Sequence, residues 1–182
     1  YSRSEPSYGL PGGKAVMSGL SVDDGISGSG PGLRSRFIYQ GGRRDRRERE
    51  FYGFGTVTEC QLDSGTNGAT LRSVVREFDV SGYYSQGNLL SESVFDPIRG
   101  KMSETVNKYY TYALAPAGKG WSFAERPGYG SDSGAAWTPL RFTEGRVYDL
   151  TGRYVPLTQD SLAYCVAPGN FGEVRETKFS SK

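Results

Sequence analysis

Histidine is absent from this sequence, and its absence excludes several classes of chemistry. A Ser-His-Asp or Cys-His nucleophile needs an imidazole as general base, and the usual zinc sites need imidazole ligands. Cysteine is scarce as well, with Cys60 and Cys165 alone. Two thiols are too few for a disulfide scaffold and lack the CxxC spacing of a zinc site. We interpret them either as two independent half-buried thiols or as a pair that closes a long loop.

Long apolar runs are also missing. No stretch approaches the roughly 18 apolar residues that a membrane-spanning helix needs, so the sequence predicts no membrane span. No signal-peptide pattern is found, and the first residue is Tyr1 rather than Met, which predicts a trimmed or processed N-terminus. The net charge of +2 makes the chain no polycation, so nucleic acid is disfavoured as a partner.

Glycine and aromatic residues are abundant instead. The 182 residues include 26 Gly, 13 Tyr and 9 Phe, whereas hydrophobic residues make up 36%. Aromatic rings can pack while their edges stay hydrated, so the composition predicts a small and partly aromatic core. The length fits one domain, or one modest domain with long arms.

The chain divides into two regions. Residues 1–34 are rich in Gly, Ser and Pro without a sustained period, and we expect an extended N-terminal arm. Residues 35–182 are expected to form a single small α+β domain. Strand-like segments lie at 35–40 and 51–62 and again at 137–142, 146–157 and 161–166, with Thr151-Gly152 as a hairpin turn.

Two segments have helical spacing. Asp96-Pro97 is a good helix start, and Pro116 is a stop signal. The apolar residues between them recur on one helical face and predict a main helix over 97–114: Met102, Val106, Tyr109, Tyr110 and Ala113. The segment 69–80 has the same spacing and favours a short helix, although its β-branched residues leave a strand open. The predicted fold class is therefore α+β, an antiparallel β-rich domain with one main helix and an extended N-terminal arm.

Arginine is concentrated in one short block, which supplies most of the candidate binding residues: Arg43, Arg44, Arg46, Arg47 and Arg49. Such side chains grip carboxylates in bidentate fashion or stack on aromatic faces. Three interpretations stay open, namely a solvated charged turn, a contact to an acidic protein partner, and a nucleic-acid contact. Tyr109, Tyr110 and Trp121 are further partner-binding candidates, because Tyr, Trp and Arg are enriched in interface anchors.

No pattern selects a catalytic or metal-binding residue. Carboxylate pairs at 23–24, 48 and 50, and 173 and 176 could act as acid and base, but nothing in their surroundings distinguishes them. We therefore expect a non-enzymatic structural or linker protein that binds other protein subunits of a larger assembly. The alternatives are a small β-rich domain that binds a ligand or chromophore, and a carboxylate-based hydrolase.

The segment GGKAVMSG at 12–19 resembles the Gly-Gly-Lys-aliphatic turn of phycobilisome linker proteins, and the Gly/Ser arm and Tyr/Arg-rich composition are similar to theirs. This resemblance implies a role in photosynthesis, a chloroplast or thylakoid-associated location, and acidic phycobiliprotein partners. It also implies a bilin attached to a thiol such as Cys60 or Cys165. No cofactor is otherwise required.

Overall fold

The structure is a computed structural model that describes residues 1–23, 25, 32–63, 68–117, 120–125, 136–164 and 174–180. Within these ranges the ordered elements are fourteen β-strands: β1 (Ser2–Arg3), β2 (Ala15–Val16), β3 (Gly19–Val22), β4 (Leu33–Arg44), β5 (Phe51–Leu62), β6 (Thr70–Phe78), β7 (Leu89–Asp96), β8 (Gly100–Tyr109), β9 (Tyr112–Ala117), β10 (Gly120–Glu125), β11 (Ala136–Trp137), β12 (Leu140–Tyr148), β13 (Tyr154–Tyr164) and β14 (Val174–Ser180).

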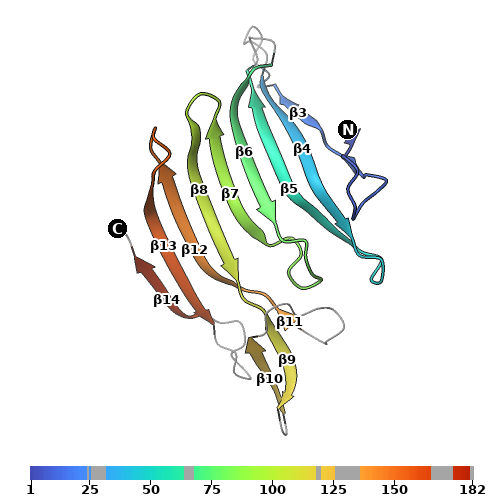
Figure 1. The fold of residues 1–182 in the computed structure, drawn as a ribbon, viewed down its shortest axis with the longest axis vertical. Helices are drawn as coiled ribbons and strands as arrows, with labels where there is room; N and C mark the ends of the chain where they lie inside the picture. Colours follow the sequence, from blue (N-terminus) through green and yellow to red (C-terminus); the bar gives the residue numbers. More distant parts are fainter. Residues whose placement is uncertain are drawn as a thin grey trace.

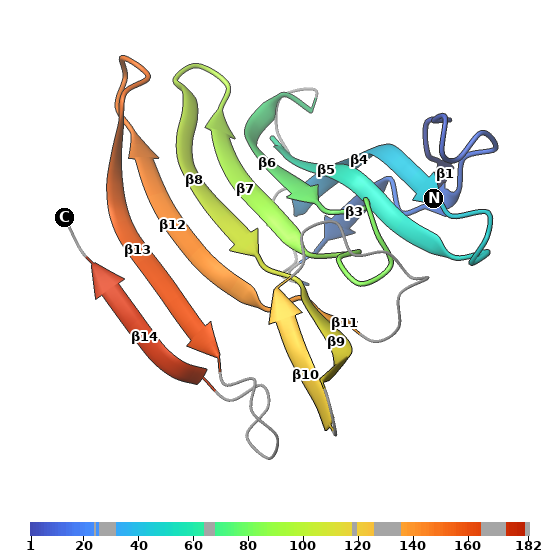
Figure 2. The same cartoon turned by 60° about the horizontal axis from the view of Figure 1, so that its bottom comes forward.

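One broad antiparallel sheet dominates the molecule. Its nine strands lie in the order β14-β13-β12-β8-β7-β6-β5-β4-β3, so most neighbours in space are also neighbours in sequence. The sheet twists and curves, and a small sheet in the order β10-β9-β11 projects from the end where β8 finishes and β12 begins (Figures 1 and 2). The strands β1 and β2 form a separate short ribbon.

The predicted α+β fold class is wrong, because the described part of the chain contains strands and no helix. The segment 97–114, predicted as the main helix, is a hairpin turn followed by β8 and the start of β9. The Asp96 carboxylate does accept backbone N–H groups, from Ile98 at 2.9 Å and Arg99 at 2.8 Å. These bonds close a tight turn between β7 and β8, and Gly100 leaves it with a φ of 80°.

The short helix favoured over 69–80 is also wrong. That segment is β6, which pairs with β5 on one side and β7 on the other. Its β-branched residues suit a pleated surface between two neighbours, so the strand alternative was the correct one. The strand predicted at 51–62 coincides with β5, and the Thr151-Gly152 turn lies between β12 and β13 as predicted.

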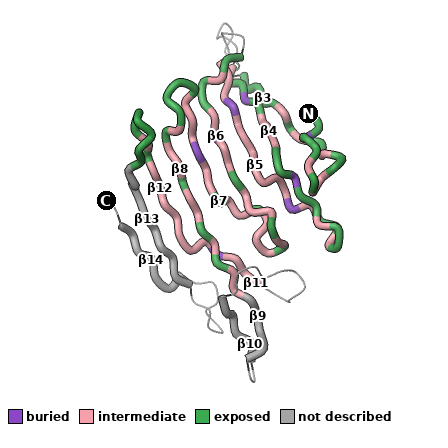
Figure 3. Tube along the Cα trace, viewed as in Figure 1, coloured by how far each residue is buried: buried purple, intermediate pink, exposed green. Residues whose placement is uncertain are grey.

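The large sheet is a single layer with little apolar burial. Among the described residues the buried hydrophobic side chains are Tyr52, Cys60 and Val74, and none is completely buried. Figure 3 shows intermediate and exposed positions along most of the strands. A domain ordinarily buries the apolar face of a sheet against a second layer. Over the residues whose burial is described, from β3 to β12, both faces of the sheet remain largely accessible.

The residues predicted as the N-terminal arm include β1, β2 and β3. The edge strand β3 pairs with the beginning of β4, and the Ser18 carbonyl accepts from the N–H of Phe37 at 2.9 Å. Further on, the N–H of Arg44 donates to the Gly9 carbonyl at 3.0 Å, and the Ser7 hydroxyl donates to the Gly42 carbonyl. The N-terminal segment therefore lies beside β4 and continues to the turn that joins β4 to β5.

Candidate partner-binding site

The five candidate arginines gather on one hairpin, residues 43–50, which we call the arginine hairpin. Arg43 and Arg44 end β4, and Arg46, Arg47 and Arg49 lie in the turn before β5. The turn forms because the Asp45 carboxylate accepts the N–H groups of Arg47 at 2.8 Å and Glu48 at 3.0 Å. The same two bonds lower the pKa of Asp45. The carboxylate is thus committed to holding the turn together.

Glu48 is also turned inward. Its Oε2 accepts from the Tyr52 hydroxyl at 2.5 Å, and its Oε1 is buried. Burial and this hydrogen bond raise the pKa of Tyr52. Tyr52 is one of the few buried apolar residues, so the Tyr52–Glu48 bond ties the turn to the core of the sheet. One carboxylate of the hairpin therefore faces the protein, whereas the arginine side chains face solvent.

Arg49 has an unusual backbone. Its φ of 58° is the only positive φ of a non-glycine residue in the described ranges. A side chain at such a position clashes with its own backbone, at a cost of about 1 kcal/mol. The turn nevertheless places a cation there, and Arg49 is exposed.

A loop from the N-terminal segment, residues 7–14, lies against the hairpin, and we call it the N-terminal loop. It is bonded to β4 through Ser7 and Gly9, as described above. The two backbones approach closely at Gly9, where a Cβ would make a tight 3.1 Å contact with the Gly42 carbonyl oxygen. At the end of the loop, the Lys14 ammonium lies 3.9 Å from the centroid of the Phe51 ring, a cation–π contact.

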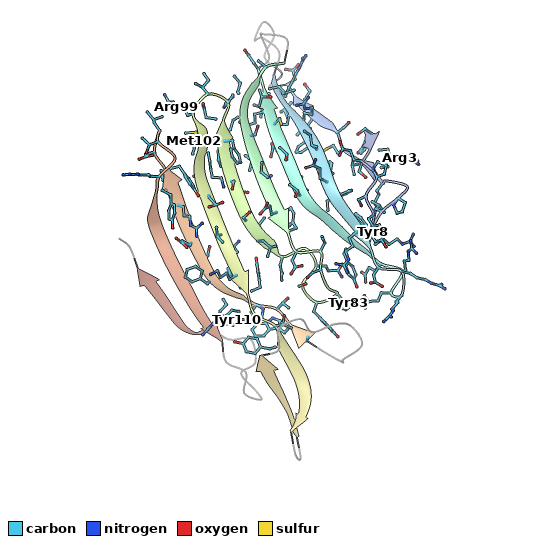
Figure 4. The ribbon with its side chains drawn as sticks, viewed as in Figure 1. Arg3, Tyr8, Tyr83, Arg99, Met102 and Tyr110 are labelled. Carbon is cyan, nitrogen blue, oxygen red and sulfur yellow. The ribbon has the colours of Figure 1, made fainter. Side chains whose placement is uncertain are left out.

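Three adjoining hollows separate the N-terminal loop from the arginine hairpin, with volumes of about 420, 690 and 340 Å³. Arg44 lines all three, and we call the combined feature the arginine groove. Figure 4 shows Tyr8 and the side chains around it at this corner of the sheet. Other linings are backbone of glycine residues and the apolar side chains of Leu10, Pro11 and Val80.

The groove carries an excess of positive charge, with Asp45 as the one carboxylate in its lining. Within the described part of the chain, the side chains of Arg43, Arg44, Arg46 and Arg49 form no ion pair with a carboxylate. Arg43 instead lies over the ring of Tyr52, 5.8 Å from its centroid. An array of guanidinium groups along a groove can bind carboxylates through charge-assisted, bidentate hydrogen bonds.

The aromatic candidates lie elsewhere. Tyr109 ends β8 and Tyr110 follows it, at the junction with the small sheet, away from the arginine hairpin (Figure 4). The N–H of Tyr110 donates to the Pro139 carbonyl at 3.3 Å. Trp121 is in β10, where the structure describes the backbone. The arginine and aromatic candidates therefore do not form one site.

Of the two thiols, Cys60 is buried at 6% exposure within β5, and Cys165 lies outside the described residues. The Ser73 hydroxyl donates to the Cys60 sulfur at 3.8 Å. In the described ranges there is no group of three or more His, Cys, Asp or Glu side chains that could hold a metal ion. The same ranges contain no helix long and apolar enough to cross a membrane.

A second charged cluster, on β7, β8 and β12, was missed by reasoning from the sequence. Glu104 is at its centre and accepts from Lys101 at 2.7 Å, Arg146 at 3.0 Å and Tyr148 at 2.7 Å. Burial opposes its ionisation, but the three hydrogen bonds outweigh burial and lower the pKa of Glu104 to about 2. With every oxygen of Glu104 engaged, the cluster cross-links strands and offers no reactive group. Charged residues that alternate along adjacent strands are the sequence signal that could have predicted this cluster.

The family model and the solved structures that match this chain all concern Tc toxin proteins. The family model described as insecticide toxin TcdB middle/N-terminal region matches residues 2–80. A crystal structure of TcdB2-TccC3 is similar with a TM-score of 0.59 and 14% identity, over 89% of this chain and 11% of that chain. A Photorhabdus luminescens Tc holotoxin pore structure has a TM-score of 0.50 and 13% identity, over 76% of this chain and 9% of that chain. No curated protein matches.

These likenesses correct the resemblance to phycobilisome linkers. The segment GGKAVMSG falls inside the range matched by the TcdB model, and the fold is that of part of TcdB2-TccC3. In the structure, Gly13 and Lys14 belong to the loop against the arginine hairpin. The phycobilisome and photosynthesis assignments are therefore wrong. The chain spans about a tenth of the length of the solved chains that it resembles.

Proposed function

We propose that this chain is a structural segment of a toxin assembly, in which its open sheet provides surface that other protein segments or subunits cover. The observation that carries the proposal is the near absence of buried apolar side chains from the described part of a nine-stranded sheet. A single layer cannot bury its own faces, so neighbours must do so.

The exposed area agrees with this argument. The chain exposes 11917 Å². A compact protein of 19.9 kDa is expected to expose about 8,700 Å². The difference, roughly 3,000 Å² on this chain alone, is at least as large as one partner's share of an obligate protein interface. The exposed apolar residues Met102 and Val147 lie together with Val94 along a hollow on one face of the sheet, which is where we place one packing surface.

The comparisons support the kind of assembly. The family model concerns the middle/N-terminal region of the TcdB toxin, and the similar solved structure contains TcdB2 together with TccC3. By analogy, we propose that this sheet is part of a longer protein, and that the partner of that protein is similar to TccC3. We also propose that the chain has no catalytic role, since its best-defined carboxylate, Glu104, is fully engaged by Lys101, Arg146 and Tyr148.

The proposal is tested by co-expressing the tagged chain with TccC3 and measuring the mass of the purified product. The expected result is a defined complex, in which amide hydrogen exchange along β7, β8 and β12 is slower than in the isolated chain. A chain that purifies alone, with the same exchange in the presence and absence of TccC3, would contradict the proposal.

A matched pair of variants makes the test specific to the sheet face. Val147→Glu places a charge on the apolar hollow, where Val147 is 40% exposed, and should reduce recovery of the complex. Ile98→Glu places the same charge on the β7–β8 turn, where Ile98 is 94% exposed, and should leave recovery unchanged. Equal recovery of both variants would argue against packing on this face.

A further inference from the structure

We infer that the arginine groove binds an extended, acidic peptide segment of a protein partner. This inference deepens the proposed function and rests on it, because it names the chemistry of one attachment point in the assembly. It is carried by the charges, shape and backbone of the groove, each of which points to carboxylates on an extended chain.

Arginine predominates where a ligand would lie, and Asp45 is the one carboxylate in the lining of the three hollows. The side chains of Arg44, Arg46 and Arg49 line the groove and make no ion pair within the described residues. Of the three acids of the hairpin, Asp45 holds the N–H groups of the turn, Glu48 accepts from Tyr52, and Glu50 is exposed but does not line the groove. A ligand carboxylate would therefore meet guanidinium donors whose carboxylate neighbour in the lining, Asp45, already accepts backbone N–H groups.

The shape suits a polypeptide rather than a compact anion. The three hollows share Arg44, and neighbouring hollows also share Gly9 or Gly13, so they follow one another along the N-terminal loop. Much of the lining is glycine backbone, with nothing within 4 Å of a Cβ built on Gly12. Val80 and Leu10 add apolar contacts, which favours acidic residues interspersed with an apolar one.

Nucleic acid is the competing ligand, and the charge distribution disfavours it. Phosphate backbones are bound by basic surfaces that extend along the polymer. The basic side chains that line the hollows come from one hairpin and the adjoining Lys14, on a chain whose net charge is +2. The local array matches a few carboxylates on a peptide better than a run of phosphates.

Arg49 provides independent support. Its φ of 58° would be relaxed by glycine, yet the position carries an arginine whose side chain lines two of the three hollows. Strained backbone conformations of this kind concentrate at binding sites, where the side chain contributes to function.

The test is fluorescence anisotropy on the intact chain with a fluorescein-labelled synthetic peptide in which Asp and Glu flank a central Ile. The expected result is saturable binding that weakens as salt is raised. Arg44→Gln and Arg49→Gly should each weaken it about tenfold, as expected for loss of one charge-assisted contact. Arg99→Gln is the matched control, because Arg99 is an exposed arginine of the β7–β8 turn, and should leave binding unchanged.

Three results would overturn the inference: no binding of the acidic peptide, equal loss in Arg99→Gln and Arg44→Gln, or tighter binding of a single-stranded oligonucleotide that the groove variants abolish. Arg49→Gly is expected to relieve backbone strain, and its urea denaturation midpoint, measured in parallel, separates a loss of binding from a loss of folding. A chain that assembles with TccC3 but ignores the peptide would contradict this inference alone. Peptide binding without assembly would instead contradict the proposed function.

Discussion

Arg49 and Gly100 occupy equivalent positions in two turns of the same kind. In each turn an aspartate, Asp45 or Asp96, accepts the N–H groups two and three residues later. In each, the residue four positions after the aspartate has a positive φ, 58° for Arg49 and 80° for Gly100. Glycine satisfies this backbone without strain and arginine does not.

Substitutions at these two positions should change the free energy of unfolding in opposite directions. Arg49→Gly is expected to raise the free energy of unfolding by up to about 1 kcal/mol, because the strain is removed. Gly100→Ala is expected to lower it by about 1 kcal/mol, and for backbone reasons alone, since nothing lies within 4 Å of a Cβ there. Urea denaturation midpoints measure both. A destabilised Arg49→Gly variant would show that the arginine side chain contributes to the fold.

Glu104 should make stability depend on pH in the acid range. Its pKa is lowered to about 2 in the folded state, from 4.5. Because the folded pKa is the lower one, the contribution is complete above about pH 4.5 and is lost as the pH falls towards 2. A tenfold change in the acid dissociation constant corresponds to about 1.4 kcal/mol, so the stability lost is on the order of 3 kcal/mol. Denaturation midpoints measured across this range provide the test.

The control for this prediction is Glu104→Gln, which should flatten that part of the pH dependence and lower stability at neutral pH. The variant leaves Arg146 and Lys101 without the charge that they share, although Arg146 keeps its 3.0 Å contact with Glu144. An unchanged acid profile in Glu104→Gln would assign the pH dependence to other carboxylates. Glu5→Gln, at an exposed position, is the comparison that should alter nothing.

Gly13 should be the most sensitive glycine of the N-terminal loop. Its φ is 61°, and a Cβ there would lie 2.5 Å from the Ser4 carbonyl oxygen, a backbone atom that cannot rotate away. Gly13→Ala therefore combines strain with a clash and should displace the β1–β2 ribbon while the large sheet stays intact. Hydrogen exchange should accelerate at residues 2–16 and not in β6 or β7. Uniform acceleration would mean that the ribbon supports the whole fold.

Cys60 should resist modification in the folded chain. It is 6% exposed, in a strand with a neighbour on each side. In a Cys165→Ser background, a thiol reagent should label Cys60 at the rate of unfolding and immediately in denaturant. Rapid labelling without denaturant would show that β5 opens locally.

The strand at 51–62 could be predicted because its aromatic and β-branched residues favour an extended backbone irrespective of its neighbours. The hairpin at 97–100 could not, because an Asp96 carboxylate that accepts N–H groups, followed by Pro97, is compatible with both a helix start and a tight turn. Gly100 and the pairing of β8 with both β7 and β12 decide the outcome. Because β12 is distant from β8 in the sequence, the residues of 97–114 themselves contain no signal of this pairing.

Only one wall of the candidate site could be predicted from the sequence. Its arginines are a contiguous block, so composition alone identified them. The opposite wall comes from residues 7–14, which the Ser7–Gly42 and Gly9–Arg44 hydrogen bonds bring across from another region of the sequence. Residues 1–34 lacked a periodic pattern, and periodicity cannot reveal a loop that packs through glycine.

The strand order has a consequence for how the chain folds as it is synthesised. From β3 to β8, each strand pairs with the one made just before it, so the sheet can grow one hairpin at a time from the N-terminal side. The exception is β12, which must reach back past β9, β10 and β11 to pair with β8. Until β12 is made, β8 is the growing edge, and that interval is when the nascent chain is most exposed to misassembly.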